Sequence, residues 1–163
     1  MLKYVDTLVS FSEVPDEISL CINISKCPCH CIGCHSPYLA EDIGDELNLK
    51  SLINLLKENN GITCVCLMGG DSEPKEINNY AQAIQKYNPE LKVAWYSGKQ
   101  ELSKYIDLKY FNYIKLGPYI EELGPLNSKT TNQRFFKVCS IYDSTRRNWE
   151  LKLIDITYKF QKW

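Results

Sequence analysis

The sequence has no run rich in lysine and arginine, and its formal net charge at pH 7 is only −1. A nucleic-acid-binding protein usually carries a basic patch or stripe, so this charge pattern argues against a nucleic-acid partner. The pair Arg146-Arg147 is the nearest approach to a basic run, and we interpret it as a solvated pair.

Long apolar runs are missing as well. No stretch approaches the roughly 18 apolar residues that a membrane-spanning helix needs, which argues against a membrane protein. Residues 1–6 lack the apolar core of a signal peptide. We therefore expect a cytoplasmic protein.

The chain also lacks internal repeats, low-complexity tracts and linkers. Its 163 residues, of which 44% are hydrophobic and 24% charged, are enough for one globular domain with a sizeable core. We therefore expect a single domain over residues 1–163. In its C-terminal tail we expect Tyr158, Phe160 and Trp163 to be packing residues.

Cysteine, in contrast, is abundant, because the chain has eight. Four of them crowd into one stretch of eight residues, 27–34, which is too tight for a spread-out disulfide framework. In a reducing compartment such a cluster more often binds metal. We expect the other four in the core, because cysteine buries well. They are Cys21, Cys64, Cys66 and Cys139.

Apolar periodicity predicts alternating strands and helices. Strands are expected over residues 18–24, 62–68, 91–96 and 111–116, with an outer strand over 4–11. Two helices are expected to begin at the Asn48 cap and at Pro74. A third, short helix is expected over residues 99–106. This alternation argues for parallel βα units. Residues 134–141 and 151–158 instead predict a C-terminal β-hairpin.

Glycine-containing loops follow the predicted parallel strands. Ligands in such folds bind at the carboxyl ends of the strands. The sequence therefore predicts that one rim is formed by the cysteine loop, Gly69-Gly70-Asp71, Ser97-Gly98 and residues 115–117.

Three of the clustered cysteines form a C-x3-C-x2-C triplet: Cys27, Cys31 and Cys34. Three thiolates at this spacing can hold three irons of a [4Fe–4S] cluster and leave the fourth iron open to a substrate or cofactor. Zinc is the rival metal, although structural zinc usually takes four ligands in two separated pairs. Because Cys29 lies inside the triplet, other sets of three remain open, and His30 or His35 could join a zinc site.

The triplet, placed after a strand, resembles the signature of the radical S-adenosylmethionine (SAM) enzymes. Gly69-Gly70-Asp71 resembles the Gly-Gly-Glu loop of that superfamily. Three further segments resemble the anaerobic ribonucleotide reductase activating proteins: CIGCHSP at 31–37, GPYIEEL at 117–123 and TNQR at 131–134. The resemblance runs from about residue 15 to residue 138.

The resemblance implies an open partial (β/α) barrel, since about 200 residues are needed to close a full one, with the small C-terminal hairpin beside it. It implies a [4Fe–4S] cluster on Cys27, Cys31 and Cys34, and SAM as the second cofactor. The residues implied to bind SAM are Gly33, Cys34, His35, Gly69, Gly70, Asp71, Ser97 and Lys115.

The resemblance also implies a reaction and its partners. An electron donor such as flavodoxin or ferredoxin reduces the cluster, and SAM is cleaved to methionine and a 5′-deoxyadenosyl radical. That radical takes a hydrogen atom from a glycine of the large subunit of anaerobic ribonucleotide reductase, which is the glycyl-radical partner. No group beyond the cluster ligands is expected to be catalytic.

The chain departs from the family pattern at several positions. Gly33 stands where most radical SAM enzymes carry an aromatic residue, Ser36 where asparagine is common, and Lys115 where many relatives carry aspartate. Two alternatives stay open: activation of another glycyl-radical enzyme, and a non-catalytic zinc or iron–sulfur binding module. The segment Asn132-Gln133-Arg134 is a surface loop, a SAM contact or a partner contact.

Overall fold

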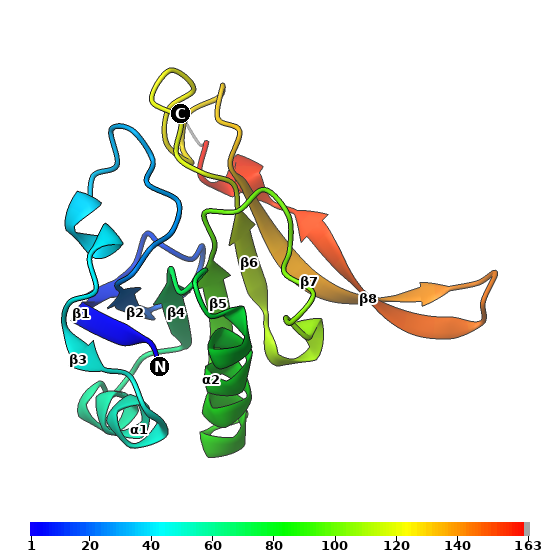
Figure 1. Ribbon diagram of the computed structural model, residues 1–163. Helices are drawn as coiled ribbons and strands as arrows, with labels where there is room; N and C mark the ends of the chain where they lie inside the picture. Colours follow the sequence, from blue (N-terminus) through cyan, green and yellow to red (C-terminus); the bar gives the residue numbers. More distant parts are fainter. Residues whose placement is uncertain (162–163) are drawn as a thin grey trace.

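The computed structural model describes residues 1–161 and is built on one mixed sheet of eight strands (Figure 1). The strands lie in the order β3-β1-β2-β4-β5-β6-β7-β8. Their bounds are β1 Lys3–Ser10, β2 Ser19–Ile24, β3 Asp45–Glu46, β4 Cys64–Met68, β5 Lys92–Tyr96, β6 Tyr113–Leu116, β7 Arg134–Asp143 and β8 Asn148–Asp155.

Helices are few in the described residues. The two α-helices are α1 (Leu49–Glu58) and α2 (Pro74–Tyr87). Three short 3-10 helices are η1 (Pro37–Ala40), η2 (Leu108–Tyr110) and η3 (Thr157–Lys159). Neither α-helix is long and apolar enough to cross a membrane, within the part of the chain that the structure describes.

The prediction of an open partial (β/α) barrel is wrong. Only β2, β4, β5 and β6 run parallel, and β1 and β7 flank them with antiparallel pairing. The predicted helix over 99–106 does not form, so the connection from β5 to β6 carries only η2. A sheet with antiparallel strands on both sides and helices in only two crossovers does not wind on into a barrel.

Several local predictions are confirmed. Asn48 caps α1, because its side chain accepts a hydrogen bond from Ser51 N while the Ser51 hydroxyl accepts one from Asn48 N. Pro74 begins α2, which ends before Asn88. The two C-terminal strands form the predicted hairpin, paired from Phe136 with Asp155 to Asp143 with Asn148, although the second strand covers Asn148–Asp155 and not the predicted 151–158.

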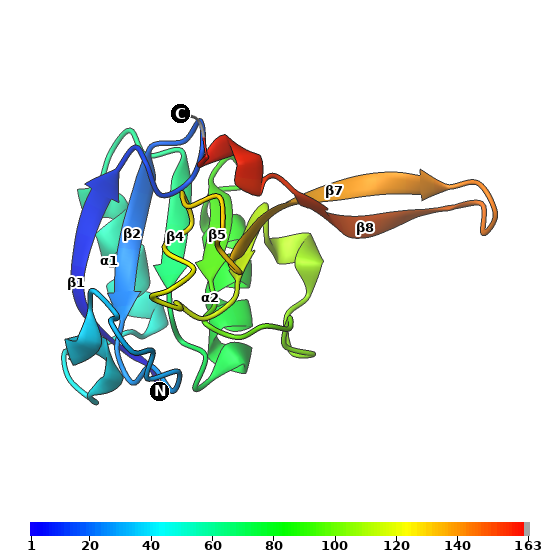
Figure 2. The same cartoon turned by 90° about the horizontal axis from the view of Figure 1, so that it is seen from above.

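Each face of the sheet has its own apolar core. The two helices cover one face, where α1 and α2 side chains pack on Leu20, Ile22, Val65, Leu67, Val93, Trp95 and Ile114. Figure 2 shows both helices behind the sheet, while irregular segments cross its front. On that second face Cys21, Cys64 and Cys66 lie buried with Ala94, Tyr113 and Phe135. Burial of these three cysteines in the core is as predicted.

The C-terminal tail packs only in part. Phe160 lies edge-on against Phe135, with ring centroids 4.9 Å apart, whereas Tyr158 is exposed. Trp163, also expected to pack, lies outside the described residues. Cys139 is half-buried on β7 rather than fully in the core.

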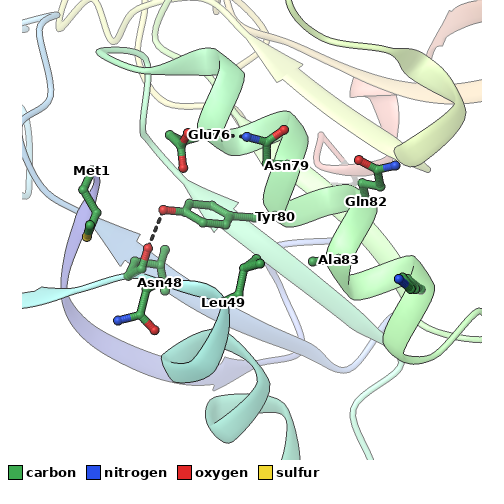
Figure 3. A pocket seen from close by; sticks show the side chains of 10 residues that line it. Met1, Asn48, Leu49, Glu76, Asn79, Tyr80, Gln82 and Ala83 are labelled. Atoms are coloured by element: carbon green, nitrogen blue, oxygen red, sulfur yellow. Dashed lines mark hydrogen bonds between the residues drawn. The ribbon is translucent and has the colours of Figure 1, made fainter.

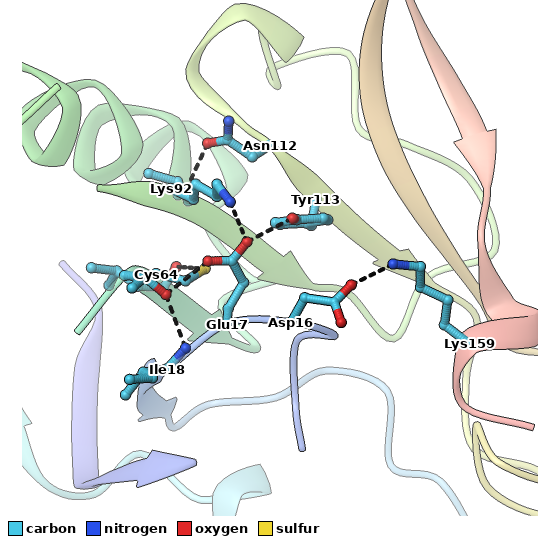
Figure 4. A network of polar contacts seen from close by, with 11 residues as sticks. Asp16, Glu17, Ile18, Cys64, Lys92, Asn112, Tyr113 and Lys159 are labelled. Atoms are coloured by element: carbon cyan, nitrogen blue, oxygen red, sulfur yellow. Dashed lines mark hydrogen bonds and ion pairs between the residues drawn. The ribbon is translucent and has the colours of Figure 1, made fainter. Parts of the chain in front are cut away.

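A buried carboxylate joins the amino ends of the central strands (Figure 4). Glu17, just before β2, is 5% exposed. It accepts hydrogen bonds from Thr63 Oγ1 at 2.7 Å, from Tyr113 Oη at 2.8 Å and from Lys92 Nζ. Since these donors lie at the starts of β4, β6 and β5, the network fixes the four parallel strands at the end opposite the predicted rim.

Candidate functional site

The cysteine loop, residues 25–36, leaves the carboxyl end of β2 (blue, Figure 1) and is tied at its base. Lys26 N donates to Glu41 O at 2.9 Å and Cys27 N donates to Leu39 O at 2.8 Å. His30 and Gly33 turn the chain within the loop through positive φ angles of 45° and 74°. All four loop cysteines are free thiols and half-buried.

Asp71 connects the loops that follow β4 and β5. Its Oδ1 accepts a hydrogen bond from Ser97 Oγ, and its Oδ2 accepts one from Gly98 N at 2.9 Å. The chain reaches this position through Gly69 and Gly70, whose φ angles of 96° and 84° favour glycine. A Cβ on Gly70 would lie 2.4 Å from Ile77 Cδ1, so a side chain there is also excluded by α2.

Lys115 lies beneath the same two loops. Its Nζ donates to Ser97 O at 3.3 Å and to Gly117 O at 2.5 Å, and the side chain is buried. Burial lowers the pKa of Lys115 to about 8, while negative charge on Asp71, Cys31, Cys29 and Cys27 acts in the opposite direction. We call Asp71, Ser97, Gly98 and Lys115 the Asp71 cluster.

Cys29 brings the cysteine loop onto the Asp71 cluster. A Cβ built on Gly98 would lie 2.5 Å from Cys29 Sγ, so the thiol rests directly on this glycine. Burial, together with the nearby Asp71 and Cys27, raises the pKa of Cys29 to about 12. Sequence reasoning gave Cys29 no role, yet it is the thiol that brings the loop onto the cluster.

The predicted rim is thus found in part. The structure brings Asp71, Ser97 and Lys115 together at the carboxyl ends of β4, β5 and β6, and the cysteine loop after β2 reaches them through Cys29. Gly69 and Gly70 lead into the same cluster, and Gly69 N donates to Tyr96 O at 2.9 Å.

The far side of the cysteine loop faces another segment. A Cβ on Gly33 would lie 3.2 Å from the carboxylate of Glu121, which belongs to the GPYIEEL segment. Cys34 N closes a turn onto Cys31 O at 3.2 Å, and His35 follows directly. Glu121 is a neighbour that sequence reasoning did not assign, although its segment had been singled out as a motif.

The TNQR segment holds the chain that carries Glu121. Asn132 Nδ2 donates to Pro118 O at 3.0 Å, and Thr131 Oγ1 donates to Gly124 O at 3.2 Å. Arg134 Nη1 donates to the carbonyls of Thr131 and Gln133. These contacts attach the segment to Pro118 and Gly124, and the three roles left open for Asn132-Gln133-Arg134 stay open.

The predicted metal ligands Cys27, Cys31 and Cys34 share the loop but do not form a closed ligand set. Within residues 1–161, no three His, Cys, Asp or Glu side chains are arranged so that they could hold a metal ion. The donors themselves suit a soft metal or an iron–sulfur cluster, because four unpaired thiols lie in one loop beside a buried lysine. The ligand set therefore stays a prediction that the donor chemistry fits.

One cavity lies away from this cluster. Its volume is about 500 Å³, and it lies between the start of α1 and α2, around Asn48, Glu76 and Tyr80 (Figure 3). Tyr80 Oη donates to Leu47 O across it. None of the sequence-predicted site residues lines this cavity.

Comparison with known proteins gives no further assignment. No protein-family model matches the chain, and searches of curated proteins and of solved structures found no match.

Proposed function

We propose that this chain is a cytoplasmic activating enzyme that depends on a [4Fe–4S] cluster and SAM and generates a glycyl radical on anaerobic ribonucleotide reductase. The observation that carries the proposal is the meeting of the cysteine loop with Asp71, Ser97 and Lys115 at the carboxyl ends of the parallel strands. The C-x3-C-x2-C spacing of Cys27, Cys31 and Cys34 is the reason for proposing a [4Fe–4S] cluster. The proposal does not depend on a barrel.

Cys27, Cys31 and Cys34 would hold the cluster through their thiolates. When bound, the cluster supplies the electron that cleaves the sulfonium bond of SAM. Lys115 places a buried amine within electrostatic reach of Cys27 and Cys31, two of the three residues that would hold the cluster.

Asp71 is suited to hold the ammonium group of SAM. A carboxylate offers about four lone-pair positions, and hydrogen bonds from Ser97 Oγ and Gly98 N occupy two. The remaining acceptors can take a charge-assisted hydrogen bond from a ligand. Because the loop after β5 already holds both carboxylate oxygens, this acceptor is oriented before the ligand binds.

The partner reaction is tested by mixing the anaerobically reconstituted protein with anaerobic ribonucleotide reductase, SAM and dithionite. We expect the doublet of a glycyl radical in the electron paramagnetic resonance spectrum. A loaded protein that cleaves SAM but yields no doublet would contradict this partner and favour another glycyl-radical enzyme.

The ligand set is tested by a matched pair of variants. Cys31→Ala should abolish cluster binding, whereas Cys29→Ala should leave it largely intact, as judged by iron and sulfide content and the visible absorption spectrum. The opposite pattern would overturn the assignment of Cys27, Cys31 and Cys34. Tight zinc binding with no cluster on reconstitution would favour a non-catalytic metal module.

A further inference from the structure

The C-terminal hairpin extends beyond the body of the protein (Figures 1 and 2). Strand β6 pairs only with Arg134–Lys137 of β7, so residues 138–143 of β7 and their β8 partners form a two-stranded arm. A two-stranded hairpin is marginally stable in water on its own, and three or more strands are usually needed. The arm therefore lacks a neighbouring strand.

Strand β8 is the last strand of the sheet and forms its long free edge. Its pairing with β7 is regular over all eight residues, from Asn148 to Asp155. Natural proteins usually shorten, bulge or cover such an edge, because its free N–H and C=O groups can pair with another strand. Within the described residues, no segment covers β8.

The arm also exposes large apolar side chains. Trp149 is 69% exposed and Leu151 is 41% exposed. Both lie on one face of β8, and Tyr142 on β7 stacks edge-on against Trp149 with centroids 5.4 Å apart. Exposed apolar side chains gathered in this way on one element are typical of an interaction site.

The order of residues in β8 matches a second copy of itself. If two β8 strands pair antiparallel about a two-fold axis at Leu151, then Glu150 lies opposite Lys152 of the second copy, and Lys152 opposite Glu150. On the other face, Leu151 meets its own copy and Trp149 lies opposite Leu153. Opposite charges and apolar pairs directly across from each other stabilise an antiparallel pair.

Neighbouring registers pair the side chains across the two strands less favourably. An axis at Lys152 places lysine opposite lysine, and an axis at Glu150 places glutamate opposite glutamate, which destabilises the pair. A shift of a single residue would move the side chains to the wrong face. The axis at Leu151 is therefore the central register that gives complementary charge on one face and apolar contact on the other.

We propose that two copies of this chain dimerise through antiparallel pairing of their β8 strands about a two-fold axis at Leu151. Such a dimer is closed, because both copies use the same surface. It turns the two arms into a four-stranded ribbon and buries both free edges. The proposal rests on the arm alone and is independent of the function proposed above.

Charge reversal tests the register. By sedimentation equilibrium, we expect the wild type to be a dimer, and Glu150→Lys and Lys152→Glu each to raise the dimer dissociation constant about 10-fold or more, since each turns two attractive pairs into repulsive ones. Mixing the two single variants should restore association, as a heterodimer detected by native mass spectrometry. Lys50→Glu, an exposed reversal on α1, is the control and should leave the dimer unchanged.

Cross-linking provides a test that does not depend on charge. Leu151→Cys places two thiols opposite each other at the axis and should give a covalent dimer on mild oxidation. Ile154→Cys, which lies opposite Asn148 in this register, should cross-link no more than the wild type. A monomeric wild type would overturn the proposal, and the free edge of β8 would then be expected to bind a different partner. A dimer that survives both charge reversals, or that cross-links equally through both cysteines, would also overturn it.

Discussion

Asp71 acts at the scale of a single residue, because both of its carboxylate oxygens accept hydrogen bonds from the next loop. We expect Asp71→Asn to weaken SAM binding about 10- to 100-fold, since a hydrogen bond to a charged group contributes about 1.5–3 kcal/mol. Isothermal titration calorimetry on the reconstituted protein measures this loss. Ser97→Ala, which keeps the carboxylate, should cost less. Unchanged SAM affinity in Asp71→Asn would contradict the role of this side chain.

Gly98 is the contact point between the cysteine loop and the Asp71 cluster. In Gly98→Ala the new methyl group would lie 2.5 Å from Cys29 Sγ, and we expect a loss of about 1–3 kcal/mol in the free energy of unfolding. The double variant Gly98→Ala/Cys29→Ala should recover most of this loss, because the sulfur is gone. Urea unfolding measures both. Equal stability of the single variant and the wild type would show that the loop does not rest on Gly98.

Residue types at loop positions were the most predictable part of the site. Gly69, Gly70 and Asp71 follow an apolar strand, and Ser97 follows the next, so their proximity could be inferred from the sequence. The positions of Cys29 and Glu121 could not, because they depend on how two long irregular loops fold back. No periodicity specifies that path.

At the scale of elements, the Glu17 network fixes the starts of the parallel strands. Burial by itself raises the pKa of Glu17, but hydrogen bonds from Lys92, Thr63 and Tyr113 outweigh it and lower the pKa below its usual 4.5. A carboxylate with a lowered pKa stabilises the fold above its unfolded pKa, and this contribution is lost as the pH falls through the folded value.

We therefore expect Glu17→Gln to lower the free energy of unfolding by about 1–3 kcal/mol at pH 7. The difference in the free energy of unfolding between the variant and the wild type should shrink as the pH falls below 4.5. In that range the Glu17 carboxylate of the wild type becomes protonated and loses its charge. Urea unfolding at several pH values measures this. Lys57→Gln, which removes an exposed charge on α1, is the control. A difference that stays constant with pH would contradict a stabilising carboxylate.

At the scale of the whole molecule, the sequence predicted most strands, both α-helices and the hairpin, but not the architecture. Periodicity identified β2, β4, β5 and β6 as strands, and caps placed α1 and α2. It did not show that β1 and β7 pair antiparallel on either side, because pairing direction depends on contacts distant in sequence. The weak pattern over 99–106, with few apolar positions, also overstated the number of helices.

The whole molecule joins the cysteine loop to the Asp71 cluster at one end of a mixed sheet, and the central claim is that this junction cleaves SAM. The most direct test is to reconstitute the protein anaerobically, add SAM and dithionite, and measure 5′-deoxyadenosine by chromatography. We predict that the wild type and Cys29→Ala produce it, and that Cys31→Ala does not. A wild-type protein that carries a complete cluster and produces no 5′-deoxyadenosine would contradict the account.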